Sequence, residues 1–218
     1  MISVLVKSPA KVLALGFLAI GMFLLIQVVA PIISFEIWQI GQNLESNLIT
    51  PQNSNEASIL GVSVNNKDNF PEFVSSLKRE TQPNYTKFSL SIPRLKIEKV
   101  DVLVDSNDIS KSLAQLPGSA LPGEKGNLFI SGHSALSQVF SLKEAVFSKL
   151  PDLKKGDQII LETPGSKFVY EVTGFKVVSP NDLSVINAPE EQGRYVSLMT
   201  CVPPGLNFKR LVVLGKIL

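Results

Sequence analysis

An uncharged run of 24 residues near the N-terminus divides this chain of 218 residues into two unlike parts. The run extends from Val12 to Phe35 and reads VLALGFLAIGMFLLIQVVAPIISF. As an α-helix it would be about 36 Å long, which exceeds the roughly 30 Å thickness of a bilayer core. The sequence therefore predicts a transmembrane anchor over residues 12–35.

The charges on either side of this run predict its orientation. Lys7 and Lys11 precede it, and no Lys or Arg follows until Lys67. Because positive residues favour the cytoplasmic side, residues 1–11 are expected to form a short cytoplasmic tail, with the rest of the chain outside the cytoplasm. A cleaved signal peptide is the alternative, but its apolar region is usually only about 7–15 residues long. Pro31 also follows the one small-residue site, so an uncleaved anchor is favoured.

Beyond the anchor, the chain changes character near residue 87. Residues 36–86 are rich in Asn and Ser and lack a sustained apolar period, so they are expected to form a polar linker, with a short helix over 73–78. From Lys87 the sequence KFSLSIPRLKIEKVDVLVD is β-branched and roughly alternating. Further strands are expected up to His133, on both sides of Pro164-Gly165, before Cys201 and over the last ten residues.

The absence of a strand–helix–strand rhythm decides the fold class. One short helix is expected over 136–150, where apolar residues recur at three- and four-residue spacings. The pattern predicts a mainly β domain over 87–218, a mainly antiparallel barrel or sandwich with one or two short helices. The net charge is only +2, which predicts no strong field for nucleic acid.

Three candidate functional residues stand at the ends of predicted strands. His133, the only histidine, ends one strand, Cys201, the only cysteine, ends another, and Arg210 opens the next. A thiolate can attack an amide carbonyl, an imidazolium favours the thiolate and can protonate the leaving amine, and a guanidinium can stabilise the oxyanion. The alternatives are a buried structural cysteine, a structural histidine and a surface arginine. A metal site would need added carboxylates, and no ligand spacing for one is present.

Four segments in order resemble the sortase family, the membrane-anchored bacterial cysteine transpeptidases. They are SIPRLKIEKVDV, LPGSALPGEKGNLFISGHS, SLMTC and CVPPGLNFKRLVVLG, and SLMTC has Ser197 where the family usually has Thr. The resemblance implies a closed eight-stranded sortase-like β-barrel preceded by the transmembrane helix. It implies no cofactor and leaves calcium activation, known in some members, open.

The same resemblance implies an activity and partners. Cys201 would cleave an LPxTG-like C-terminal sorting signal of a surface protein or pilin and form a thioacyl enzyme. An amine of a peptidoglycan precursor or a pilin lysine would then resolve it. His133 would be the acid and base, and Arg210 the substrate clamp. The turn C-x-P-x-G-x-N-x-x-R resembles the pilus-assembling class C. However, Asp68-Asn69-Phe70 matches that class's lid poorly, and no second anchor precedes Leu218.

Substrate contacts are also expected from the resemblance. The connection over 179–193 lies where the family has the wall of its substrate groove, and its apolar Leu183, Val185 and Ile186 would either contact the substrate or pack onto the barrel. On the strand before Cys201, the expected contacts are Ser197, Leu198 and Thr200. Two other functions stay open: a relative that mainly hydrolyses, and an inactive membrane-tethered β-domain that binds peptides or scaffolds an envelope complex.

Overall fold

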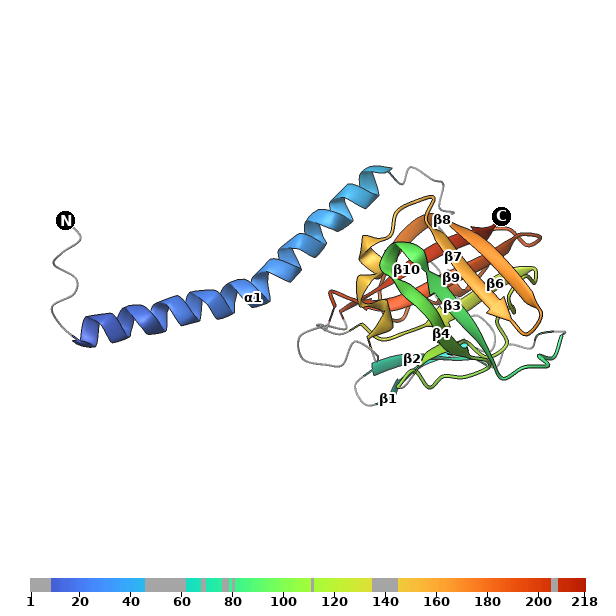
Figure 1. Ribbon diagram of the computed structural model, residues 1–218, viewed down its shortest axis with the longest axis horizontal. Helices are drawn as coiled ribbons and strands as arrows, with labels where there is room; N and C mark the ends of the chain where they lie inside the picture. Colours follow the sequence, from blue (N-terminus) through green and yellow to red (C-terminus); the bar gives the residue numbers. More distant parts are fainter. Residues whose placement is uncertain are drawn as a thin grey trace. The chain divides into compact units, whose positions relative to one another are not determined.

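The computed structural model describes residues 9–45, 62–67, 70–75, 79, 81–110, 112–134, 145–204 and 208–218. The chain divides into two compact units, Met1–Glu45 and Ser46–Leu218. The first contains α1 (Pro9–Glu45), which includes the run predicted as an anchor (Figure 1). Within the described ranges, no helix combines the length and the apolarity that a membrane crossing requires.

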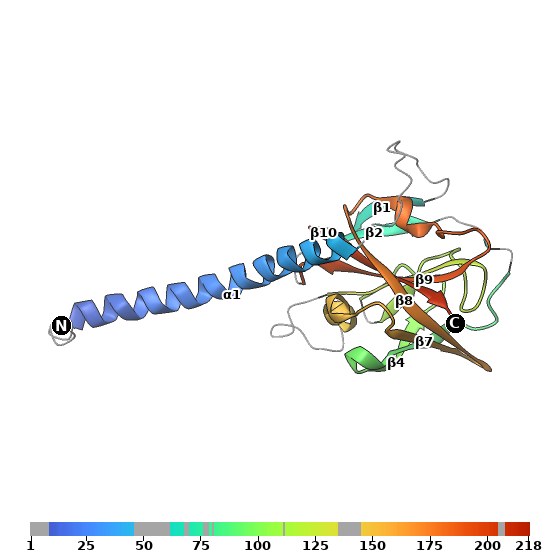
Figure 2. The same ribbon diagram turned by 90° about the horizontal axis from the view of Figure 1, so that it is seen from above.

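The second unit contains a closed barrel of eight strands (Figure 1, Figure 2). Around the barrel the order is β10-β8-β7-β3-β4-β5-β6-β9. Two neighbouring pairs, β4 with β5 and β6 with β9, are parallel, and the others are antiparallel. The strands are β3 (Lys87–Ile92), β4 (Ile97–Leu103), β5 (Leu113–Gln115), β6 (Gly126–Ser131), β7 (Gln158–Thr163), β8 (Ser166–Val178), β9 (Arg194–Val202) and β10 (Lys209–Ile217).

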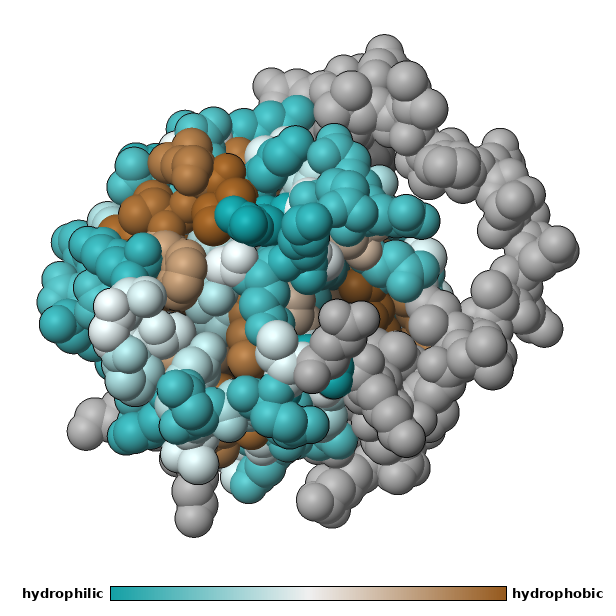
Figure 3. All heavy atoms as spheres, turned by 90° about the vertical axis from the view of Figure 1, so that its right-hand side faces the viewer, coloured by the Kyte–Doolittle hydropathy of each residue, from teal (hydrophilic) through white to brown (hydrophobic). Residues whose placement is uncertain are grey.

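Alternating side chains build the barrel core. In β3, Phe88, Leu90 and Ile92 are buried, while the residues between them are not. This is the period of two that a strand with one face in a core requires. β9 is instead buried at every position after Arg194, because its outer face is also covered. Figure 3 shows the contrast at the surface, where hydrophilic side chains cover most of the described part of one face and apolar side chains gather in patches. The predicted mainly β, eight-stranded barrel is confirmed.

The helices expected from the sequence differ from those observed. The helix expected over 73–78 is wrong in its first part, because β2 (Phe70–Ser75) pairs with β1 (Val62–Lys67) in an antiparallel hairpin. Of the helix expected over 136–150, residues 136–144 lie outside the described residues. Of the described remainder, residues 146–150 belong to a 3₁₀ helix, η2 (Val146–Asp152), which contains Pro151, and Ala145 directly precedes it. The other two short helices of the described barrel are η1 (Pro93–Leu95) and η3 (Leu183–Ile186), also 3₁₀.

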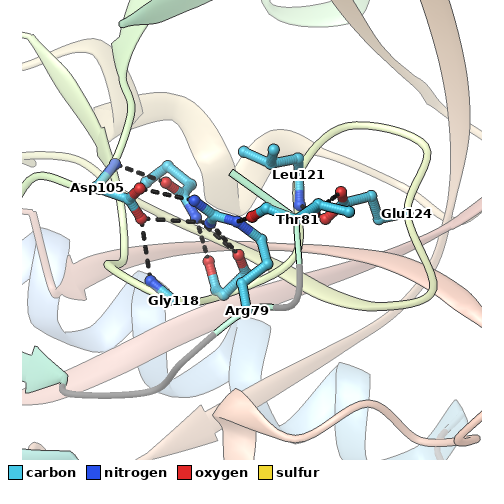
Figure 4. Close-up of polar contacts among 8 residues, drawn as sticks. Arg79, Thr81, Asp105, Gly118, Leu121 and Glu124 are labelled. Atoms are coloured by element: carbon cyan, nitrogen blue, oxygen red, sulfur yellow. Dashed lines mark hydrogen bonds and ion pairs between the residues drawn. The ribbon is translucent and has the colours of Figure 1, made fainter. Parts of the chain in front are cut away.

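A polar network holds the chain ahead of the first barrel strand (Figure 4). The guanidinium of Arg79, only 8 % exposed, donates to both carboxylate oxygens of Asp105, to the carbonyl of Ser119 at 2.7 Å and to the carbonyl of Thr81. Thr81 in turn hydrogen-bonds Glu124. Part of the segment expected to be a linker is therefore tied to the loops that flank β5.

Replacing Arg79 with alanine is expected to lower the free energy of unfolding by about 2–3 kcal/mol, because charge-assisted hydrogen bonds are lost and Asp105 loses its cation. Chemical denaturation of the full chain in detergent measures the change. Arg94→Ala is the matched control, since Arg94 is exposed. Equal stability of the two variants would contradict the role given to Arg79.

Candidate active site

Cys201 and Arg210 face each other across two neighbouring strands. They are directly opposite in the antiparallel pair of β9 and β10. Side chains of directly opposite residues lie on the same face of a sheet, with Cβ atoms about 5 Å apart. Both are buried: Cys201 is 2 % and Arg210 is 1 % exposed. The short connection after Cys201 thus returns the chain so that the guanidinium lies beside the thiol.

His133 reaches the same end of the barrel through a different pairing. The parallel ladder of β6 and β9 ends with Ser131 opposite Met199, so two more residues bring position 133 level with position 201. Both neighbours of His133 are bonded to β9. The carbonyl of Gly132 accepts a hydrogen bond from Thr200 Oγ1 at 2.9 Å, and Ser134 Oγ donates to the carbonyl of Cys201 at 2.6 Å. The half-buried His133 is therefore held beside the cysteine strand.

Close packing also fixes the path of the chain into His133. A Cβ atom added at Gly132 would lie 2.5 Å from Leu113 Cδ2 and 2.6 Å from Phe147 Cδ2. Both partners are fully buried core residues. Because no side chain fits there, glycine lets the backbone pass against the core just before the histidine. The carbonyl of His133 accepts from the amide of Phe147 as well.

The connection over 179–193 covers the outer face of the strands that carry Cys201 and Arg210. Met199 of β9 and Val212 of β10 each lie two residues from one of these two, so they share their face. Both belong to an apolar cluster formed by strand residues and by the connection. We call this connection, residues 179–193, the wall. The buried members of the cluster are Leu116, Phe129, Val178, Val185, Ile186, Met199 and Val212.

The residues expected to contact substrate fall into three groups. Val185 and Ile186 are buried in the cluster, and Leu183 packs against it half-buried. Ser197 is buried on the same face and hydrogen-bonds Asn127. Leu198 and Thr200 alternate with these on the opposite face of β9, toward the barrel interior, and are also buried. Their predicted contacts with substrate stay predictions.

Burial and charge act in opposite directions on the thiol. Burial raises the pKa of Cys201 to about 11, although the nearby Arg210 guanidinium lowers it in part. Burial likewise lowers the pKa of Arg210, and the nearby Cys201 partly raises it again. In this conformation the thiol is protonated at neutral pH, so the thiolate needed for attack forms only when the proton is removed.

Alkylation by iodoacetamide should report this pKa directly. Because only the thiolate reacts, the rate for Cys201 in the full chain is expected to rise about tenfold per pH unit from pH 7 to pH 10. A peptide with one ordinary cysteine, of pKa about 8.5, should level off near pH 9. A plateau for Cys201 at or below pH 9 would contradict the buried, protonated thiol.

Three residues were not singled out from the sequence as parts of a site: Gly132 and Ser134, which flank His133, and Asn127, near the start of β6. A hydroxyl directly after the only histidine and an Asn at the start of a strand were the available signals, but their partners lie about 60 to 70 residues away. Among the described residues, no group of three or more His, Cys, Asp or Glu side chains could hold a metal ion.

A comparison with protein families gives a match to the sortase domain over residues 90–218, more than half of the chain. This chain belongs to the sortase family. The sortase domain ends with the last residue of the chain and includes all eight barrel strands except the first residues of β3.

Individual sortases are similar at a moderate level. Sortase D of Bacillus subtilis (strain 168) is 31% identical over 131 residues, covering 58% of this chain and 61% of that protein. Sortase A of Bacillus anthracis is 36% identical over 132 residues, covering 58% and 57%. The crystal structure of Streptococcus pneumoniae sortase C is similar with a TM-score of 0.54 and 27% identity, covering 62% of this chain and 70% of that one. The chain thus spans about three-fifths of the length of the curated relatives named here.

Proposed function

We propose that this sortase is a cysteine transpeptidase that cleaves an LPxTG-like sorting signal and transfers the acyl part to an amine. The observation that carries the proposal is the meeting of three chain segments at one end of the barrel. Cys201 lies opposite Arg210, and the backbone on both sides of His133 is hydrogen-bonded to the cysteine strand. Family membership supplies the reaction class for this arrangement.

The proposed reaction has two stages. First, the proton of Cys201 passes to His133, and the thiolate attacks the carbonyl carbon of the Thr–Gly bond. Arg210 stabilises the oxyanion, because a guanidinium stays charged and offers several donors. The carbon–nitrogen bond then breaks, and the imidazolium gives its proton to the leaving glycine amine.

In the second stage an acceptor amine attacks the thioester. Neutral His133 takes the proton of that amine, the carbon–sulfur bond breaks, and the thiolate leaves. Water in place of the amine would give hydrolysis. Because burial keeps the pKa of Cys201 near 11, the thiolate–imidazolium pair is a minor population at neutral pH, and the substrate reacts with that population.

The proposed substrates are surface proteins or pilins with a C-terminal LPxTG-like signal, bound against the wall. The proposed acceptors are an amine of a peptidoglycan precursor or a pilin lysine. Support for a pilin comes from the class-C-like turn between Cys201 and Arg210 and from the similarity to Streptococcus pneumoniae sortase C, which is described with regard to pilin substrate specificity. No cofactor enters the proposed steps.

We also propose that residues 12–35 anchor the protein in the cell membrane as a single span, with residues 1–11 in the cytoplasm. Residues 36–86 would connect it to the extracytoplasmic catalytic barrel over 87–218. The support is the uncharged sequence of 12–35 and the lysines that precede it. Cell fractionation tests this: the full chain should stay with membranes after a carbonate wash, and its release would refute the anchor.

The burial of the thiol favours one alternative, an inactive β-domain that binds peptides or scaffolds an envelope complex. A product assay decides between them. The full chain in detergent is incubated with an LPxTG-type peptide, with and without an amine such as triglycine. The transpeptidase predicts a ligated product with the amine and slower hydrolysis without it. An intact peptide in both reactions would support the inactive domain, and equal hydrolysis in both would indicate a hydrolase.

A further inference from the structure

Among the described residues, one buried amide side chain, that of Asn127 in β6, hydrogen-bonds the wall to the barrel. We propose that Asn127 is a positioning residue that fixes the wall, and that it thereby sets substrate binding rather than the chemical step. This inference rests on the proposed function for its kinetic part. Its structural part, the fixing of the wall, stands without it.

The contacts of Asn127 use both ends of its amide. Asn127 is only 6 % exposed. Its Nδ2 donates to the carbonyl of Val185 at 3.2 Å and to the carbonyl of Ile186 at 3.0 Å. Its Oδ1 accepts from the hydroxyl of Ser197 at 3.0 Å. One side chain therefore joins the wall to both β6 and β9.

The two carbonyls belong to the end of η3, where a helix has carbonyl groups without partners inside the helix. In a buried position such groups need hydrogen bonds from elsewhere. Asn127 supplies them, and the side chains of Val185 and Ile186 pack in the apolar cluster at the same time. Backbone and side chains of this turn are thus held by the same part of the barrel.

The other side-chain polar contacts given for the described residues between the wall and the strands are exposed, and a backbone hydrogen bond from the amide of Gly126 to the carbonyl of Gly193, at 2.8 Å, holds the last residue of the wall. Lys216 Nζ lies 3.2 Å from Glu190 Oε2, and Lys125 Nζ donates to Gln192 Oε1. Exposed ion pairs contribute little to stability. The buried amide is therefore the side-chain contact expected to decide how firmly the middle of the wall, at Val185 and Ile186, is held.

The wall packs on β9 and β10, the strands that carry Cys201 and Arg210, so its position affects how a substrate is bound beside them. Met199 and Val212, in the cluster with Val185 and Ile186, lie two residues from Cys201 and Arg210. A loosened wall would present a changed surface to a peptide without moving these two strands. The expected consequence is weaker substrate binding with a largely unchanged chemical step.

The sharpest test is Asn127→Asp, which keeps the shape of the side chain. It replaces the Nδ2 donor with a carboxylate oxygen that faces the carbonyls of Val185 and Ile186. Asn84→Asp is the matched control, since the same change is made at an exposed residue. Hydrogen exchange of the full chain in detergent, followed by mass spectrometry, reads out peptides from 179–193. We expect the amides of 179–193 to exchange about tenfold faster in Asn127→Asp than in the unmodified chain. Asn84→Asp should leave their exchange unchanged, and β9 should stay equally protected in both variants.

Protonation offers a rescue that a general loss of packing would not show. Below about pH 5 the carboxyl at position 127 is protonated and regains an O–H donor. The difference in the exchange rate of 179–193 between Asn127→Asp and Asn84→Asp, measured at the same pH, should therefore shrink. Ser197→Ala is the milder second variant, because it removes one of the three hydrogen bonds and leaves both carbonyls bonded. It should loosen the wall less than Asn127→Asp does.

In the peptide assay, Asn127→Asp is expected to raise KM about tenfold and to change kcat by less than about threefold. Unchanged exchange of 179–193 would overturn the fixing of the wall, and a lower kcat at unchanged KM would overturn its role in binding. Exchange is measured without substrate. A chain that cleaves no LPxTG-type peptide would therefore contradict the proposed function, while the exchange result would still confirm or refute the wall.

Discussion

Replacing Cys201 with alanine is expected to abolish cleavage of an LPxTG-type peptide, a loss of at least about a thousandfold. The reason is chemical, since alanine cannot form the thioacyl bond, and Cys201 is the only cysteine in the chain. His133→Ala is expected to lower kcat by about a hundredfold or more, because no other histidine can carry the proton. Peptide cleavage by the full chain, followed by liquid chromatography, measures both losses.

Stability is the control for these two variants. Cys201 is buried among strand residues, and its replacement by alanine removes one sulfur atom, so the unfolding midpoint should change little. Measurable cleavage by Cys201→Ala would assign the nucleophile to another residue. Full activity of His133→Ala would remove the histidine from the reaction.

Arg210→Lys is expected to retain only a trace of activity, a loss of about a hundredfold to a thousandfold in kcat. Lysine keeps the charge but loses the planar set of donors. Arg210→Ala removes the charge as well. Because the guanidinium lowers the pKa of Cys201, this variant should raise that pKa further and slow alkylation at every pH below it.

The cleavage rate and the alkylation rate, measured together with the stability of each variant, separate an effect on catalysis from an effect on folding. Arg210 is 1 % exposed, so its removal also leaves a buried space, and thermal unfolding of each variant accounts for that effect. Wild-type cleavage rates in Arg210→Ala would exclude arginine from the reaction. Unchanged alkylation in that variant would mean that the guanidinium does not act on the thiol.

Much of the barrel could be predicted from the sequence because its strands carry local signals. The alternation around Phe88, Leu90 and Ile92 marks β3, and Pro164-Gly165 marks the turn between β7 and β8. The parallel pairing of β6 with β9 has no local signal, because it joins segments about 70 residues apart. The hairpin of β1 and β2 was missed because half of its twelve residues are polar and Pro71 interrupts the second strand.

The candidate site also has one part that local sequence signals predict and another part that depends on long-range pairing. The opposition of Cys201 and Arg210 follows from two strands joined by a short turn, which a sequence pattern can suggest. The ties on both sides of His133 depend on the long-range pairing, so their partners could not be assigned. The sequence does not show that Cys201 and Asn127 are buried. For this reason neither the raised pKa of Cys201 nor the role of Asn127 was expected.

The proposed function requires that Cys201 and His133 meet at one end of the barrel beside Arg210 and act there on an amide bond. Intact-mass spectrometry of the full chain, mixed with an LPxTG-type peptide and quenched in acid, tests this most directly. We expect a mass increase equal to the peptide's acyl part, carried by Cys201 and removed by an added amine. An unmodified protein beside a cleaved peptide, or an adduct on any other residue, would contradict it.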